Sequence, residues 1–175
     1  DFAGWRAAAR QALPAGVDEP DIELTDLRHG DVVVIDAAEP ALDGDFLIEG
    51  VVTLREGGST VVVVVMADAD RRRWLVASPG LETWLLLEPV AGHGLFGEPP
   101  RHIQRGDRSY ALERRGQASA AGVGMHGRPA LPRVATYLYR AAPERMLWLE
   151  RWGDQVLMGE GVELAAHLVA FLPGS

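Results

Sequence analysis

Apolar runs separated by glycine-rich turns form the clearest pattern in the chain, and they are densest between residues 44 and 88. Two of these runs flank the turn at Gly57 and Gly58, and the second contains five consecutive valines, Val61–Val65. β-Branched residues favour strands, and an unbroken apolar run of this kind is typical of a strand covered on both faces. The stretch therefore predicts an antiparallel sheet.

The rest of the chain shows the same alternation of short strands and turns. The expected strands lie within residues 27–36, 45–55, 59–66, 73–78, 82–88, 134–141 and 146–152, and another begins at Gly106. Gly50, inside the second of them, indicates a bulge or a close approach of another backbone. Residues 67–73 and 122–133 are expected to be loops. The run 162–172 fits either a helix or a strand, because it is short while its leucines recur at helical spacing.

Breaks in this pattern divide the chain. Residues 1–24 are expected to form a short helix and a linker, since Ala and Arg favour a helix and Pro14 ends it. A spacer rich in Gly and Pro, 90–100, separates a first β repeat, 25–90, from a second, 91–175. The predicted fold class is all-β, with two pseudo-repeated antiparallel sheets or half-barrels packed together in one domain.

Composition excludes several kinds of chemistry. The chain has no cysteine, which excludes disulfides, Cys-ligated metals and a cysteine nucleophile. All 17 basic residues are arginine, so there is no lysine for a Schiff base or a phosphate-binding P-loop. The net charge is −8, with −10 in residues 1–90 and +2 in residues 91–175. An acidic chain of this kind is repelled by phosphate backbones, so we expect no nucleic-acid partner.

The sequence also bears on location. No apolar run approaches the ~20 residues that a membrane-spanning helix needs. The first residues lack the basic-then-apolar layout of a signal peptide, and the absence of an initial Met suggests a trimmed chain. We expect a cytoplasmic protein, with peripheral association at a membrane as the alternative.

No motif for catalysis or metal binding stands out. The five histidines lack the spacings of helical or strand metal sites, and there is no G-x-S-x-G nucleophile elbow. The glycines of 122–127 are not spaced as in a dinucleotide-binding loop. We therefore expect no catalytic group, metal or cofactor, and a Ser–His–Asp group assembled in space is only a minor alternative.

Arginine and tryptophan supply the candidate binding residues. Arg71, Arg72 and Arg73 form the densest basic cluster, which either pairs with nearby acids such as Asp68 or anchors an acidic partner. Trp74 and Trp148 are expected in the core. Trp84 and Trp152 are either core residues or exposed aromatics of a binding face.

The chain resembles a known family. The stretches LRHGDVVVID (27–36), FLIEGVVTLREGGST (46–60), RRRWLVASPGLETWLLLE (71–88), RHIQRGDRSYALERRGQASAAG (101–122) and WLERWGD (148–154) are similar to the bacterial domain-of-unknown-function family 4178. The resemblance implies a small β protein without an assigned enzymatic activity. It also implies an accessory role at a membrane or in an envelope-stress system, because members are often encoded near polyamine aminopropyltransferase-like enzymes and small membrane proteins.

Two hypotheses follow from these observations. The first is a non-enzymatic β module that binds another protein, favoured by abundant strands and surplus aromatics. The second is a small-molecule binder for a cationic ligand such as a polyamine, with the acidic first half as the attracting field and Trp84 or Trp152 facing an ammonium group.

Overall fold

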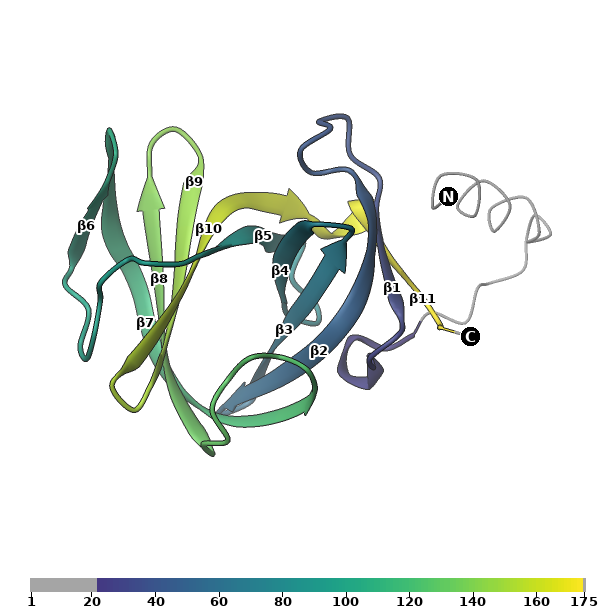
Figure 1. The fold of residues 1–175 in the computed structure, drawn as a ribbon, viewed down its shortest axis with the longest axis horizontal. Helices are drawn as coiled ribbons and strands as arrows, with labels where there is room; N and C mark the ends of the chain where they lie inside the picture. Colours follow the sequence, from purple (N-terminus) through teal and green to yellow (C-terminus); the bar gives the residue numbers. More distant parts are fainter. Residues whose placement is uncertain (1–21, 175) are drawn as a thin grey trace.

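The computed structural model describes residues 22–174 as a β-barrel with additional strands (Figure 1). Its strands are β1 (Val32–Ile35), β2 (Gly44–Glu56), β3 (Ser59–Asp68), β4 (Arg71–Ala77), β5 (Thr83–Val90), β6 (His102–Arg105), β7 (Arg108–Gly124), β8 (Arg133–Ala141), β9 (Arg145–Trp152), β10 (Gln155–Ala165) and β11 (Val169–Leu172). Two 3₁₀ turns, η1 (Leu24–Asp26) and η2 (Ala166–Leu168), complete the described elements. No helix of this region is long and apolar enough to cross a membrane. The short helix expected within residues 1–24 ends before Pro14 and lies outside the described residues.

Two seams close the barrel. The first half supplies the consecutive strands β2–β5 and the second half supplies β7–β10; β5 pairs with β10, and β2 pairs with β7. All neighbouring strands are antiparallel. Closure satisfies the backbone groups that open sheet edges would leave unpaired.

The predicted all-β class is confirmed. The prediction of two separate sheets or half-barrels packed together is wrong. The strands make one sheet that closes on itself, because β2 and β7 are long enough to change partners along their length. The first part of β2 pairs with β1, and its second part pairs with the last part of β7. The internal repeat stays a prediction, as do the boundaries 25–90 and 91–175.

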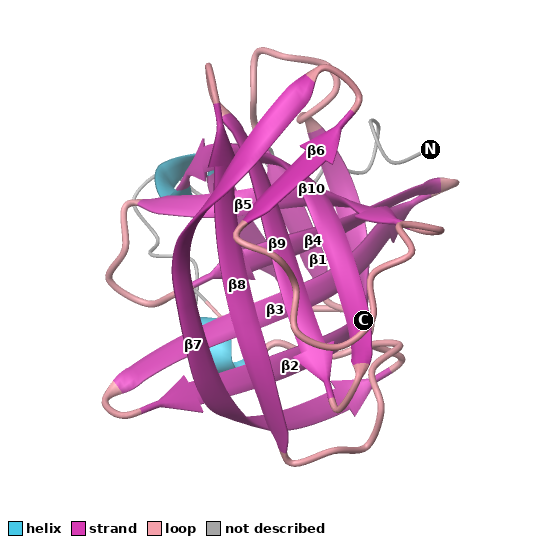
Figure 2. Ribbon diagram, turned by 90° about the vertical axis from the view of Figure 1, so that its left-hand side faces the viewer, coloured by secondary structure: helices cyan, strands magenta, loops and turns pink. Residues whose placement is uncertain are grey.

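Three apolar clusters cover the sheet on both faces. One fills the barrel interior with side chains from all eight barrel strands or their partly buried neighbours, including Val63, Trp74 and Trp148. The second lies outside the first half, under β1 and β11, and the third lies outside the second half, next to β6 and the segment before it. Figure 2 shows β6 on the outer side of the second half, nearest the viewer. The valine run is therefore covered on both faces as predicted: Val62 and Val64 face the outer cluster, while Val63 and Val65 face the interior.

The structure tests three of the local predictions: Gly50, the loop over 67–73 and the run 162–172. Gly50 lies at a register shift of the β2–β3 ladder, which confirms the bulge. The loop predicted over 67–73 is wrong, because β3 and β4 extend through most of it and leave a turn in which Ala69 has a φ of 53°. The ambiguous run 162–172 is strand, except for the 3₁₀ turn η2.

The two interior tryptophans lead to a test of the fold. Trp74 lies in β4 and Trp148 in β9, and both are buried in the same interior cluster. We expect Trp74→Ala and Trp148→Ala each to lower the free energy of unfolding by ~3–5 kcal/mol, because the barrel leaves a cavity in place of the ring. Urea unfolding measures this. Half-buried Trp84→Ala is the control with a smaller effect, and a silent Trp148→Ala would contradict the packing.

Candidate ligand site in the barrel

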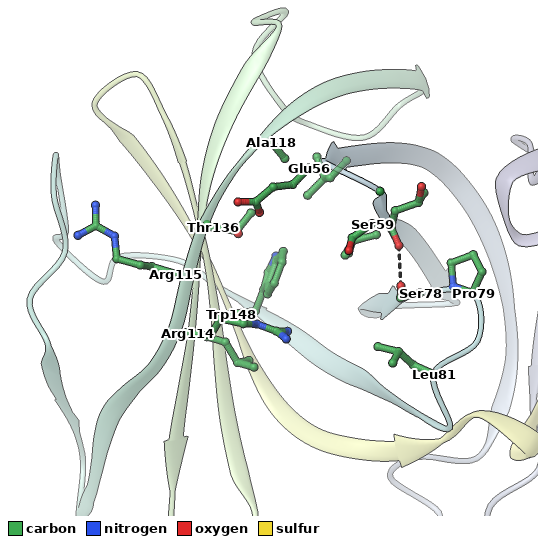
Figure 3. A pocket seen from close by; sticks show the side chains of 16 residues that line it. Glu56, Ser59, Ser78, Pro79, Leu81, Arg114, Arg115, Ala118, Thr136 and Trp148 are labelled. Carbon is green, nitrogen blue, oxygen red and sulfur yellow. Dashed lines mark hydrogen bonds between the residues drawn. The ribbon is translucent and has the colours of Figure 1, made fainter.

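A cavity of about 520 Å³ opens at one end of the barrel, between the β2–β3 and β4–β5 turns on one side and β7–β9 on the other. We call it the mouth cavity; its lining includes Leu54, Glu56, Val61, Arg114, Leu138 and Trp148. A second hollow of about 380 Å³ shares Arg114, Leu138 and Trp148 with it. In Figure 3 the Trp148 ring stands in the middle of this space. The mouth cavity thus combines an aromatic centre, apolar walls and a charged rim.

The rim charges come from the ends of several strands. Arg140 donates to both Glu113 and Glu163 at 2.7 Å, and these three side chains border the second hollow. Glu56 and Arg114 make no ion pair with another residue of 22–174, and Figure 3 shows both on the barrel side of β7, with Arg115 directed away. Gly116 makes room for the Glu56 carboxylate, because a Cβ there would lie 2.5 Å from Oε2.

A fully buried carboxylate lies below the mouth. Glu150 of β9 is 0% exposed and accepts hydrogen bonds from the indole N–H groups of Trp148 (2.9 Å) and Trp152 (3.0 Å). The three residues alternate along one strand, so their side chains share the interior face of β9. Both tryptophans therefore orient the carboxylate without neutralising it.

Arg128 supplies the opposite charge. Its Nε and one terminal nitrogen donate to the two Glu150 oxygens at 2.9 and 2.8 Å, and its Cζ lies 4.2 Å from the centre of the Trp74 ring. Its other terminal nitrogen donates to the carbonyl of His126 at 2.6 Å. Bidentate pairing of this kind matches the planar guanidinium, which also stacks well on aromatic faces.

The β7–β8 connection carries Arg128 into the barrel. β2 and β7 are antiparallel, so this connection, residues 125–132, lies at the end of the barrel opposite the β2–β3 turn. Glycines permit its close approach: a Cβ on Gly50 would lie 2.5 Å from the backbone nitrogen of His126, and one on Gly122 would overlap the His126 ring. The connection therefore closes this end, and the close backbone approach predicted at Gly50 is confirmed.

The comparison with known families bears on this whole region. A family model described as a domain of unknown function, DUF4178, matches residues 41–166. The chain belongs to the DUF4178 family. The resemblance found in the sequence is thus confirmed, and the matched span contains all eight strands of the barrel as well as Arg128 and Glu150. Comparison with curated proteins and with solved structures finds no match.

In this DUF4178 domain the predicted arginine cluster does not form one patch. Arg71 pairs with Asp68 and lies 5.2 Å from the centre of the Phe46 ring, which fits the expected local pairing. Arg72 is largely exposed, 3.7 Å from Glu49, and Arg73 lies 3.4 Å from Glu88. Successive side chains of β4 point to opposite faces, so Arg72 lies on the face opposite to Arg71 and Arg73.

The two candidate tryptophans of the DUF4178 domain also separate. Trp152 is 3% exposed, so of its two alternatives the core residue is the one that the structure shows; its indole N–H donates to the Glu150 carboxylate. Trp84 is half-buried, stacks on Phe171 with ring centres 6.0 Å apart, and donates to the carbonyl of Ser78. It borders the second hollow of the mouth.

Sequence reasoning missed Glu150, Arg128, His126 and Glu56. A signal existed for Glu150: the predicted strand 146–152 places Trp148, Glu150 and Trp152 on one face, and a carboxylate between two buried tryptophans needs a partner. The sequence carries no comparable signal for Arg128, because an arginine in a glycine- and proline-rich connection has no predictable direction. No group of three or more potential metal ligands occurs among residues 22–174.

The buried ion pair predicts a large effect of single substitutions in this DUF4178 domain. We expect Arg128→Ala and Glu150→Gln each to lower the free energy of unfolding by ~3–5 kcal/mol, because each leaves a buried charge without its partner. Chemical denaturation measures the loss. Arg140→Ala is the control, since its exposed pairs with Glu113 and Glu163 predict only ~0–1 kcal/mol. Equal losses for Arg128→Ala and Arg140→Ala would contradict this account.

The surroundings of His126 predict that the free energy of unfolding depends on pH. Burial, and next the charge of Arg128, lower the pKa of His126 below its ordinary value of 6.5, against an opposing effect of Glu150. The unfolded chain then binds a proton at higher pH than the folded chain. Stability is therefore lost as the pH falls below 6.5 toward the lower pKa of the folded state.

Unfolding free energies measured between about pH 8 and pH 5 test this. His126→Gln should show a smaller loss on acidification than the wild type, and substitution of the exposed His167 by Gln is the matched control. Parallel curves for wild type and His126→Gln would count against the assignment.

Proposed function

We propose that this DUF4178 domain is a binding protein that takes a small, amphipathic cation in the mouth cavity. The observation that carries this proposal is the mouth cavity itself, about 520 Å³ at the end of a closed barrel with the Trp148 ring in its centre. Ligand cavities of proteins typically span ~300–1,000 Å³, and the mouths of β-barrels are among their preferred places.

The lining supports a cation with an apolar body. Leu54, Val61 and Leu138 offer apolar contacts, and Trp148 offers an aromatic face. Around the two hollows Glu56, Glu113 and Glu163 carry three negative charges against three positive charges on arginines, of which Arg115 pairs with Glu98 on the outside of the barrel. Glu56, which has no ion pair with another residue of 22–174, is the acid available to an ammonium group. The Glu56 carboxylate accepts one hydrogen bond, from the backbone N–H of Gln117 at 3.4 Å, and has further acceptor positions. An aromatic face and a carboxylate without an ion pair in one cavity favour an ammonium group.

Titration with amines tests the proposal. Hexylammonium and spermidine, added at millimolar concentration and low salt, should raise the melting temperature and change the tryptophan fluorescence in a saturable manner. Glu56→Gln should weaken the response by roughly tenfold, the factor that ~1.4 kcal/mol of lost charge pairing represents.

Glu39→Gln is the matched control. It removes the same charge from an exposed acid in the β1–β2 connection, which lines neither hollow of the mouth. A wild-type protein that responds to neither amine, or an equal loss of response in both variants, would refute the mouth as a cation site.

A second candidate is the protein-interaction module. β6 and β11 stand at the two ends of the strand order, and Phe96, in the segment before β6, is 77% exposed. Phe96 forms an isolated bridge with Gln155 at the start of β10, so the second half presents both an edge strand and an exposed aromatic side chain to a partner. This candidate predicts no response to amines and one stoichiometric protein captured by the tagged domain at low salt.

A further inference from the structure

The closed end of the barrel contains a complete set of groups for one guanidinium. Glu150 accepts two parallel hydrogen bonds from Arg128, and the Trp74 ring lies 4.2 Å from the guanidinium carbon. The indole N–H groups of Trp148 and Trp152 hold the carboxylate in place from the same strand. A single ammonium would satisfy only part of this geometry, because it cannot present two coplanar donors to both carboxylate oxygens.

The groups that contact the guanidinium and the arginine that carries it belong to different parts of the fold. Trp74 lies in β4 and Glu150 in β9, so their positions are set by the ladders of the barrel. Arg128 comes from the connection 125–132, which has no strand structure. The site is therefore formed by the barrel, whereas the cation inside it is delivered by a loop.

Few bonds hold that loop. Its ends are tied by Met125, whose N–H donates to Glu49, and by Pro132, whose carbonyl accepts from Ala120. Between them, the backbone hydrogen bonds of 126–131 in the described chain stay inside the loop. The deepest attachment of the loop is the Arg128 side chain, of which only 2% is exposed.

A hollow beside the loop leads to the same site. It has a volume of about 550 Å³ and is lined by Val52, His126, Arg128, Pro129 and Trp152, among others. It gives a second side chain or a small molecule room next to Arg128, at the opposite end from the mouth cavity.

We propose that the closed end of the barrel is a guanidinium-binding site, and that Arg128 is its built-in occupant, which a ligand bearing a guanidinium group displaces. The ligand class is a monosubstituted guanidinium, either a small molecule or an arginine side chain of a polypeptide. Competition with Arg128 sets the apparent affinity, because only the fraction of molecules with the loop open can bind. The proposal is independent of the mouth cavity, which takes its cation from the other end.

Removal of Arg128 tests the site directly. We expect Arg128→Ala to bind methylguanidinium with a saturable change in tryptophan fluorescence and a rise in melting temperature, the reverse of the usual effect of a guanidinium salt. Methylammonium should bind roughly tenfold more weakly, since it lacks the second coplanar donor. The double variant with Arg128→Ala and Glu150→Gln is the control and should show no saturable response.

Three results would overturn the site: a folded Arg128→Ala without a saturable response, an equal response to methylammonium, or an equal response of the double variant. If Arg128→Ala does not fold alone, Arg128→Lys replaces it, because lysine keeps the charge and loses the bidentate pairing. Absence of a methylguanidinium response in Arg128→Lys would equally overturn the proposal.

Displacement in the wild type is tested with three probes: agmatine, L-arginine amide and a capped Ala-Arg-Ala peptide. Each acting ligand should speed the hydrogen exchange of the Arg128 amide, which in the closed state donates to Nδ1 of His126 at 3.0 Å. A response to the peptide identifies an arginine of a polypeptide as the source, and a response to the small compounds alone identifies a free guanidinium. Wild-type protein that responds to none of them overturns displacement.

Discussion

The charge of Glu150 is the constraint on which the barrel interior depends. Burial of a carboxylate is costly unless it is both paired and hydrogen-bonded, and Glu150 obtains a bidentate cation and two indole donors. These partners come from β9 itself and from the β7–β8 connection. One buried charge thereby fixes the position of a loop, the orientation of two tryptophans and the closure of one end of the barrel.

Three apolar clusters, rather than a single core, pack around this charged centre. An eight-stranded barrel has an interior just wide enough for side chains to fill, and here tryptophans and aliphatic residues of the interior cluster fill it. The outer faces of barrel strands are often exposed to solvent. Here each half is covered by its own apolar cluster, one under β1 and β11 and one beside β6. The additional strands therefore keep water from the outer face of strands that carry apolar residues on both sides.

Trp148 connects the two ends of the interior. Its ring lines the mouth cavity, and its N–H is bonded to the carboxylate that holds Arg128. Hydrogen bonds therefore connect a residue that lines the mouth cavity, through Glu150, to the β7–β8 connection. Both proposed cation sites use this arrangement, one with the face of Trp148 and the other with the carboxylate that Trp148 orients.

The sequence determined the local elements and the class of the fold. The valine run Val61–Val65 predicts a strand covered on both faces, Gly50 predicts a bulge or a close approach of another backbone, and Trp74 and Trp148 are expected in the core. These features follow from side-chain volume, β-branching and the alternation of a strand, which act between near neighbours and are therefore visible in a single sequence.

Only the tertiary structure decided how the strands are joined and where the charges meet. Closure depends on the pairing of β2 with β7 and of β5 with β10, contacts between residues far apart in the chain. The tertiary structure also decided between the two alternatives for Trp152, which is buried in the interior, and gave Arg71, Arg72 and Arg73 separate acidic partners. The partner of Glu150 lies 22 residues away in a connection without periodicity, and the pairing of a buried charge leaves no local pattern from which it can be inferred.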